Sequence, residues 1–215
     1  VSNVGLASET SHNVNLGAVL DRWETPIGRF DASINGFFRR TQDLIFMTVI
    51  LDSARYENIS DVDAWGIEGG LRWTGWGILT LGVNAFWMHA VNRSTGGFFG
   101  RFEGDRIPNQ PYLSFDFHAA VAYRWHRAGV RLRGYWYGRY LHQFYLFWEN
   151  EGIEESKLRV PSYFSQDLGM NIIFERHRLT AGFEVQNLTD ERMFDNVGVQ
   201  LPGRSFHLRL SLALE

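Results

Sequence analysis

NLTDERMFDNVGVQLPGRSFHLRLSLALE, residues 187–215, contains the pattern that decides the fold. From Ser205 onward, apolar and polar residues alternate almost without fault. The apolar set is Phe206, Leu208, Leu210, Leu212 and Leu214. A period of two predicts a β-strand whose two faces meet different surroundings. A soluble sandwich and a membrane barrel would both produce this alternation, so the rest of the chain must distinguish them.

The same alternation recurs along the whole chain, and no segment of eleven or more residues keeps a helical apolar stripe. The sequence therefore predicts an all-β, antiparallel protein with nine strands. The predicted strands cover residues 11–21, 29–40, 64–73, 78–87, 112–125, 130–140, 167–174, 178–186 and 206–214. Most are long enough for the ~9–11 residues of a tilted membrane strand.

The predicted connections alternate in length. Compact ones cover residues 21–28, 74–77, 126–129 and 175–177, and long ones cover about 44–63, 91–111, 141–162 and 188–203. Short turns at one end and long loops at the other are typical of a transmembrane β-barrel. A soluble sandwich has no reason to sort its loops in this way.

The polar faces of these strands indicate which side meets lipid. They carry Asp31, Arg39, Glu68, Arg72, Asp116, Arg124, Arg131, Arg133, Asp167, Glu184 and Arg209. An Arg at the bilayer midplane costs roughly 2–4 kcal/mol, whereas a hydrated lumen accepts charge. We therefore expect the apolar faces to point outward and the polar faces, including His118 and His207, to line the lumen.

Composition agrees with a membrane barrel. The chain has 8 Trp, 8 Tyr and 17 Phe, which suits aromatic girdles at membrane interfaces. A net charge of −3 gives no basic field for nucleic acid. No stretch approaches the ~18 apolar residues of a transmembrane helix. Residues 1–13 lack the pattern of a signal peptide, so we expect an export signal to lie upstream of Val1.

Two short segments in the quoted stretch carry a family resemblance. Asn187, Leu188, Thr189 and Asp190 form an Asn-Leu-Thr-Asp turn, and Pro202, Gly203, Arg204 and Ser205 enter the last strand. This arrangement closely resembles the C-terminus of TonB-dependent outer-membrane transporters. The passages ETSHNVNLGAVLD, NISDVDAWGIEGGLRW and RIPNQPYLSFDFHAAVAYRW resemble successive strands of the same barrels.

The resemblance implies more protein than these residues contain. Barrels of this family have 22 strands and enclose a plug domain. Residues 1–215 would then be about nine C-terminal strands of a 22-stranded barrel, without plug or earlier strands. We expect about 13 more strands and a plug, from the same protein or another chain, because unpaired edges in lipid cost several kcal/mol per group. On this view the chain is no autonomous folding unit.

The implied function is active import across the bacterial outer membrane. The partners would be outer-membrane lipid, TonB of the inner-membrane energy complex, and a scarce, large nutrient, by default a ferric siderophore. No catalytic motif stands out, so we expect no enzyme, cofactor or metal site. The alternative is a small closed barrel of eight to ten strands acting as an enzyme or adhesin, which would need residues 45–57 to supply another strand.

Two predicted loops contain candidate ligand-binding residues. They are Phe99, Arg101 and Phe102 in the loop after residue 91, and Tyr145, Phe147 and Trp148 in the loop after residue 141. Aromatic rings beside Arg suit a bulky anionic ligand such as a ferric chelate. The alternative is that residues 140–148 continue tall strands and form an aromatic girdle. For Pro202, Gly203, Arg204 and Ser205 we favour a purely structural role at the loop-to-strand transition.

Overall fold

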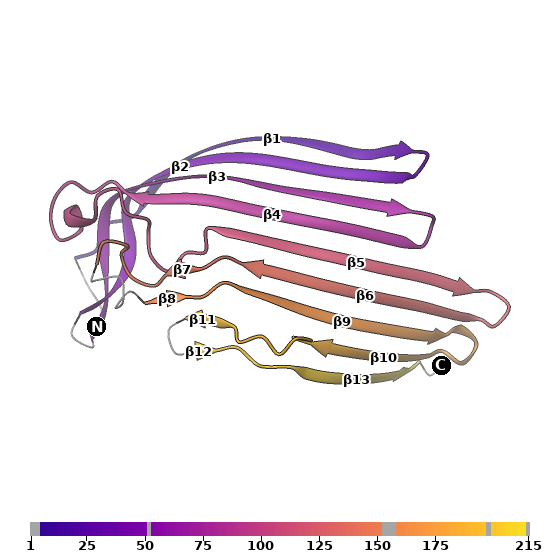
Figure 1. Ribbon diagram of the computed structural model, residues 1–215. Coiled ribbons are helices and arrows are strands. Elements are labelled where there is room, and N and C mark those ends of the chain that lie inside the picture. Colours follow the sequence, from indigo (N-terminus) through magenta and orange to yellow (C-terminus); the bar gives the residue numbers. More distant parts are fainter. Residues whose placement is uncertain (1–4, 51–52, 152–157, 197–198, 214–215) are drawn as a thin grey trace.

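The computed structural model describes residues 5–50, 53–151, 158–196 and 199–213 (Figure 1). Nine antiparallel strands form one sheet in the order β1-β2-β3-β4-β5-β6-β9-β10-β13. Their bounds are β1 Thr10–Thr25, β2 Gly28–Ile50, β3 Ser53–Gly75, β4 Leu79–Asn92, β5 Leu113–Trp125, β6 Val130–Leu141, β9 Tyr163–Phe174, β10 Leu179–Gln186 and β13 Ser205–Leu212. All nine predicted strands are confirmed.

The long connections carry the remaining short elements. Strands β7 (Phe144–Tyr145) and β8 (Arg159–Val160) pair with each other, as do β11 (Phe194–Asn196) and β12 (Val199–Gln200). The described residues also form two 3-10 helices, η1 (Phe99–Phe102) and η3 (Glu175–His177). No helix in the described ranges is long and apolar enough to cross a membrane.

The predicted sorting of connections into two ends is confirmed, with one correction. Short turns gather at one end of the sheet and long connections at the other (Figure 1). However, residues 44–63 are not a loop, because β2 and β3 continue to pair as far as Ile50 and Ser53. The run from Leu44 to Ile50 is rich in residues of high β-propensity, so the pairing of β2 with β3 continues through it instead of ending. Outside residues 51–52, the segment 45–57 thus lengthens two strands and supplies no further one, which argues against the small closed barrel.

The short turns follow from their residues. Trp76 and Gly77 both have positive φ, at 54° and 69°, and Ile78 N–H donates to the Gly75 carbonyl at 3.2 Å. Two central residues with positive φ define the type I′ turn, whose twist matches that of antiparallel strands. Gly129, with φ 64°, has the same permissive role in the turn between β5 and β6.

The register places all apolar faces on one side of the sheet. One row across the last four strands reads Leu132, Ile172, Ala181 and Leu210. Another row, across β2 to β5, reads Ile34, Gly69, Ala85 and Phe115. A slip of one residue at any pair would move that strand's apolar set to the other side, so the rows require this register.

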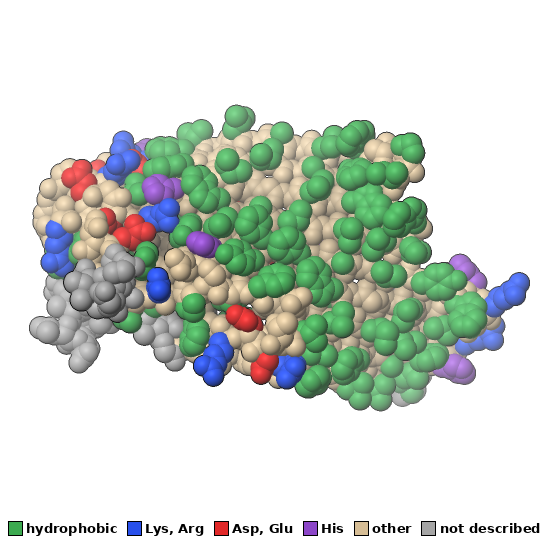
Figure 2. All heavy atoms as spheres, viewed as in Figure 1, with side chains coloured by type: hydrophobic (Ala, Val, Ile, Leu, Met, Phe, Trp, Pro, Cys, Tyr) green, Lys and Arg blue, Asp and Glu red, His purple; other side chains and the backbone are tan. Residues whose placement is uncertain are grey.

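Within the part of the chain that the structure describes, no second layer packs against the apolar face. Leu16 is 82% exposed and Leu208 is 76% exposed, although both belong to regular strands. Figure 2 shows this face as a broad band of hydrophobic side chains with charged groups beyond both ends. From Val130 to Tyr140, ten residues rise ~33 Å along the strand, or ~25 Å along the normal at a tilt of ~40°. The band therefore matches the apolar height of a membrane barrel.

The opposite face carries the predicted polar residues and their partners. Asp31 lies opposite Arg72, and Asp116 opposite Arg139. The Tyr135 hydroxyl donates to Glu184 Oε2 at 2.8 Å across Gly169, where a Cβ would meet the tyrosine ring at 2.2 Å. His118 and His207 lie on this face, as predicted. The polar side chains of this face find partners on neighbouring strands, as expected of a hydrated lumen wall.

In the described part of the chain, β1 and β13 are the two outer strands of an open sheet. The hydrophobic clusters of buried residues lie instead at the end with long loops. We call this nine-stranded sheet the wall. The packed core of the described residues lies beyond its long-loop end.

Candidate functional site

The loop between β4 and β5 is closed tightly onto the end of β4. The Asn92 N–H donates to the Asp105 carbonyl at 2.9 Å. The Ile107 N–H donates to the Ala90 carbonyl at 2.9 Å. These bonds return the chain beside β4, so that residues 93–104 form a compact bulge containing η1.

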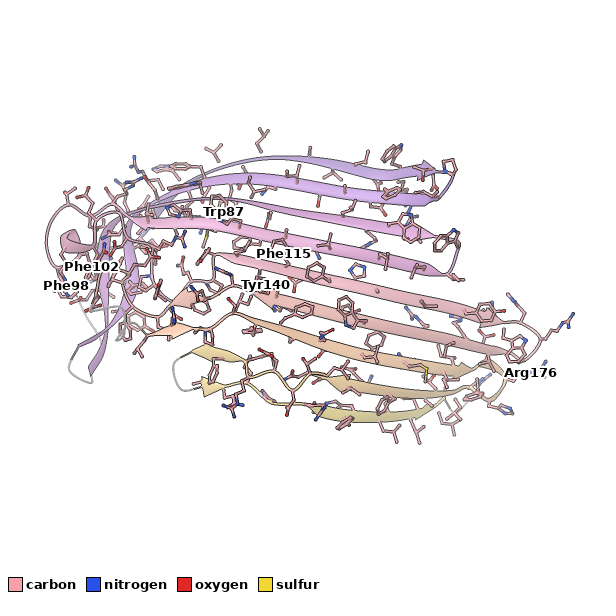
Figure 3. All side chains as sticks on the ribbon, in the orientation of Figure 1. Trp87, Phe98, Phe102, Phe115, Tyr140 and Arg176 are labelled. Atoms are coloured by element: carbon pink, nitrogen blue, oxygen red, sulfur yellow. The ribbon has the colours of Figure 1, made fainter. Side chains whose placement is uncertain are left out.

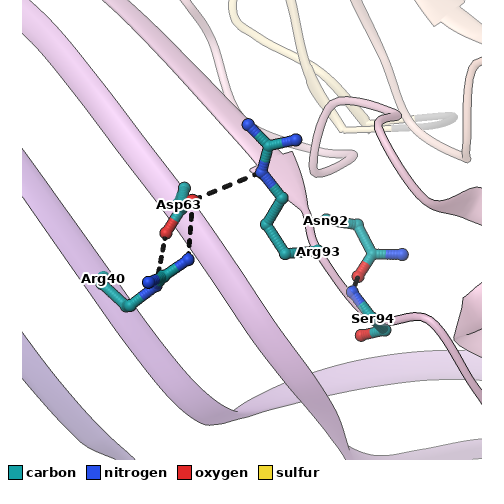
Figure 4. A network of polar contacts seen from close by, with 5 residues as sticks. All are labelled: Arg40, Asp63, Asn92, Arg93 and Ser94. Carbon is teal, nitrogen blue, oxygen red and sulfur yellow. Dashed lines mark hydrogen bonds and ion pairs between the residues drawn. The ribbon is translucent and has the colours of Figure 1, made fainter.

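Asn92 organises this bulge from inside. Its side chain is fully buried, its Nδ2 donates to the Phe99 carbonyl at 2.7 Å, and its Oδ1 accepts from the Ser94 N–H at 2.9 Å (Figure 4). An amide is the right group here because it has both donors and an acceptor. No clear signal in the sequence predicts this role, since Asn92-Arg93-Ser94 matches only a glycosylation sequon.

Three of the six candidate residues meet in the centre of the loops. Phe99, Phe102 and Trp148 are 6%, 3% and 5% exposed. The Phe102 and Trp148 rings stack with centroids 4.8 Å apart and an interplanar angle of 6°. Val62 and Ala90 form the floor beneath them. We call Val62, Ala90, Phe99, Phe102, Ile107 and Trp148 the loop core.

The loop core joins two loops that are far apart in sequence. Trp148 belongs to the connection between β6 and β9, and the tip of β2 also reaches it through Phe46, at 6.1 Å between ring centroids. Polar contacts also join these two loops. The Asn150 N–H donates to Asp105 Oδ2 at 3.2 Å, and the Asn150 amide also donates to Asp105 Oδ1. The Asn109 N–H donates to the Tyr145 carbonyl at 2.7 Å.

The exposed rim of the loop core combines charge with aromatic surface. The Arg101 guanidinium lies 4.2 Å from the Phe98 ring centroid and 4.5 Å from that of Phe102. Its ion pair with Glu151 is loose, at 3.8 Å between Nη2 and Oε1. Phe98 is 45% exposed and Phe147 is 38% exposed. Figure 3 shows Phe98 and Phe102 together at the loop end of the molecule. This rim can offer a cation and π surface to an anionic ligand.

The structure thus separates the six candidates by position. Phe99, Phe102 and Trp148 pack inside, Arg101 and Phe147 remain at the surface, and Tyr145 lies in β7 at the base of the neighbouring loop. Ligand contact by these residues stays a prediction. The alternative that residues 140–148 continue tall strands is wrong, because β6 ends at Leu141, β7 covers only Phe144–Tyr145 and Trp148 packs into the loop core. Trp87, Phe115 and Tyr140 lie lower, along the strands (Figure 3).

A second charged cluster lies where the strands leave the apolar band. Asp63 binds Arg40 through two bonds of 2.9 and 3.2 Å and Arg93 through one of 3.3 Å (Figure 4). Both Arg side chains are about half exposed, whereas Asp63 is nearly buried. One carboxylate shared by three elements ties β2, β3 and the start of the η1 loop together.

The two halves of the C-terminal motif bind each other across the last loop. Asn187 is 3% exposed, its Nδ2 donates to the Glu191 carbonyl at 2.9 Å, and its Oδ1 accepts from the Glu191 N–H at 2.8 Å. Asp190 Oδ1 accepts from the Arg204 N–H at 2.9 Å. A Cβ at Gly203 would lie only 2.9 Å from this carboxylate oxygen. These contacts fit the predicted structural role of the motif.

The motif also explains two residues in left-handed conformation. Asn187 and Asp190 have φ of 49° and 57°, values that Asn and Asp tolerate best among residues with a side chain. The Arg204 guanidinium donates to the Leu188 carbonyl at 3.4 Å, which closes the loop at its base. Pro202 needs no donor partner there because it has no N–H.

Comparison with known proteins places this architecture. The family described as "TonB dependent receptor-like, beta-barrel" matches residues 1–188. The ferric yersiniabactin uptake receptor FyuA from Yersinia pestis is similar in fold, with TM-score 0.66 and 20% identity over 94% of this chain and 28% of that chain. The copper transporter OprC gives TM-score 0.70 and 16% identity over 96% and 31%.

A third similar structure is BauA, the ferric preacinetobactin receptor from Acinetobacter baumannii, with TM-score 0.67 and 14% identity over 94% of this chain and 29% of that chain. A search of curated proteins finds no match. Because the identities are low, these structures establish the fold alone. The present chain spans between 28% and 31% of their length.

Proposed function

This chain belongs to the TonB-dependent receptor family, and on that premise we propose that it forms part of an outer-membrane transporter that imports a large, scarce nutrient with energy supplied through TonB. The carrying observation is the family match over residues 1–188. The continuous lipid-facing apolar band supports location in the outer membrane. No covalent step is needed, since the work is binding and translocation.

We propose a ferric siderophore as the cargo. FyuA and BauA are described as receptors for ferric yersiniabactin and ferric preacinetobactin. OprC is described as a copper transporter, so the fold by itself fits more than one cargo. The rim of Arg101, Phe98 and Phe147 favours a bulky anion with aromatic groups.

In this proposal the loop core holds the rim in place. Phe99, Phe102 and Trp148 fix the backbone of both loops, so that little conformational entropy is lost when a ligand binds. The Arg101–Glu151 pair is exposed on both sides and loose, so it competes weakly with an anionic ligand.

The edges of the sheet support a larger assembly. Strands β1 and β13 both face lipid on one side, and an unpaired backbone edge there costs several kcal/mol per group. We propose that about 13 further strands pair with these edges and that a plug domain fills the lumen, following the strand number of large outer-membrane transporters. Expressed alone, residues 1–215 should give no heat-modifiable, protease-resistant barrel in detergent. A stable closed monomer would contradict this part of the proposal.

The test of cargo is uptake by cells that depend on the full-length receptor under iron limitation, with a panel of iron-loaded chelates. We expect uptake of at least one chelate. In Arg101→Gln, loss of a charge-assisted contact should weaken its binding about tenfold. Arg176→Gln, at the short-turn end (Figure 3), is the matched control and should bind normally. Binding of no iron chelate, with uptake of another nutrient, would exclude the siderophore.

A further inference from the structure

The lipid-facing wall is not evenly filled. A groove of about 560 Å³ crosses β2 to β5, with Gly69 and Ala85 among its lining residues. These two residues are cross-strand partners, and Ile34 and Phe115 flank them in the same row. Trp87 and Leu113 form the next row toward the loops. Small residues between large ones leave a depression, and its mostly apolar lining suits a hydrocarbon chain.

A cation, Arg106, lies beyond the loop-side end of this groove, where it contacts His89. Along β4, His89 is four positions beyond Ala85, a rise of ~13 Å. His89 contacts the Trp65 ring at 4.6 Å between centroids and accepts from Arg106 Nε at 3.3 Å. Arg106 returns beside β4 through its bridge to Val91. Figure 2 shows Arg and His side chains bordering the loop end of the apolar band.

The Arg106 guanidinium is fixed but not neutralised by an ion pair. It lies 4.1 Å above the Tyr112 ring centroid. The ion pairs found among the described residues do not include Arg106. The Glu149 carboxylate and the Arg93 guanidinium both act electrostatically on neighbouring His89. Arg93 is paired with Asp63, and Glu149 forms no ion pair with Arg106 among the described contacts. The planar guanidinium therefore keeps donors for a bidentate partner such as a phosphate.

We propose that this face binds one phosphate-bearing membrane lipid, with an acyl chain in the groove over Gly69 and Ala85 and the phosphate on Arg106. A lipid fits better than a free anion because Arg106 contacts His89, which lies on the same face of β4 as the groove and just beyond its loop-side end at Trp87. A barrel wall meets the membrane interface at such a height. The inference rests on the membrane-spanning wall and not on the imported cargo, so chelate uptake and lipid binding can fail separately.

The test uses the full-length receptor in detergent and native mass spectrometry. Dipalmitoyl phosphatidic acid is the probe, and dipalmitoylglycerol and inorganic phosphate are the comparison ligands. We expect retention of the phosphatidic acid above both comparison ligands. Arg106→Gln should reduce its affinity about tenfold, and Ala85→Leu, which fills the groove, should reduce it by a similar factor.

Two matched variants control for charge and volume. Arg40→Gln removes a lipid-face Arg that is paired with a carboxylate, and Ala181→Leu fills the same face far from the groove. Both should retain the lipid. Heat-modifiable migration reports folding, and Arg106→Lys, which keeps the charge without the fork, replaces a variant that fails to fold. Unchanged retention in both test variants, equal loss in the controls, or equal binding of dipalmitoylglycerol would overturn the proposal.

Discussion

The wall and the loop core use the same residue types in opposite ways. Leu208 on the wall is 76% exposed, whereas Phe102 in the loop core is 3% exposed. On the wall, each apolar side chain has strand neighbours and no second protein layer, because lipid takes that place. In the loop core, water surrounds the structure, so apolar side chains must cover one another.

This difference means that the two regions should respond differently to the same kind of mutation. Charge should damage the wall because lipid solvates it poorly. Loss of volume should damage the loop core because packing is what holds it. Polar ties at the two ends of the barrel should matter less than either.

The largest expected effect is in the loop core. Trp148→Ala removes the ring that stacks on Phe102, and such truncations cost about 3–5 kcal/mol. The loss should be local: residues 93–111 and 142–150 should lose protection in hydrogen exchange while the strands keep theirs. Phe147→Ala, at a half-exposed neighbour, is the control and should change little. Equal effects of the two substitutions would mean that the loops are not held by this core.

The wall should be most sensitive to charge at mid-height. Val83→Arg places a guanidinium in lipid and should cost about 2–4 kcal/mol in denaturant unfolding of the full-length receptor in bilayers. Asn84→Arg, one residue along β4 but on the lumen face opposite Asp116, should cost far less. Should the order be reversed, the assignment of the two faces would be wrong.

The C-terminal motif should show a smaller and purely structural effect. Asn187→Ala leaves buried partners unsatisfied and places Ala at φ 49°, with an expected cost of about 1–3 kcal/mol for the loop of residues 187–204. Hydrogen exchange of that loop measures it. Thr189→Ala, at an exposed position of the same motif, should leave exchange unchanged. Altered cargo binding without altered exchange would point to a ligand role for the motif instead.

The smallest effect concerns the short-turn end. Glu175 accepts from Arg124 and Arg131 at 2.8 and 2.9 Å, and the hydrogen bond from Arg124 lowers the pKa of its carboxyl below 4.5. A carboxyl whose pKa is lower in the folded state stabilises that state at pH values above its ordinary pKa. This stabilisation is lost as pH falls through the folded-state pKa. The stability difference between the native receptor and Glu175→Gln should therefore be full at pH 7 and decline as pH falls below 4.5 through the lowered pKa of Glu175. A difference that stays constant while this carboxyl becomes protonated would contradict this ion-pair account.

The sequence by itself determined the wall. A period of two, repeated nine times with charges on one side, permits few arrangements, because strand register, loop length and the cost of charge in lipid all constrain it together. It also located the aromatic loops. It failed at residues 44–63, which it predicted as a loop: outside residues 51–52, this segment continues two paired strands.

Tertiary structure alone decided what the loops contain. Nothing in the local sequence separates Trp148, which is buried, from Phe147 beside it, which is exposed. The burial of Trp148 depends on Phe102, Val62 and Phe46, which lie between 46 and 102 residues from it along the chain. The same holds for Asn187, whose partners come from both ends of its loop. Alternation is a local property that can be seen in the residues of the strand itself. Burial in a loop depends instead on which distant segments of the chain pack over it.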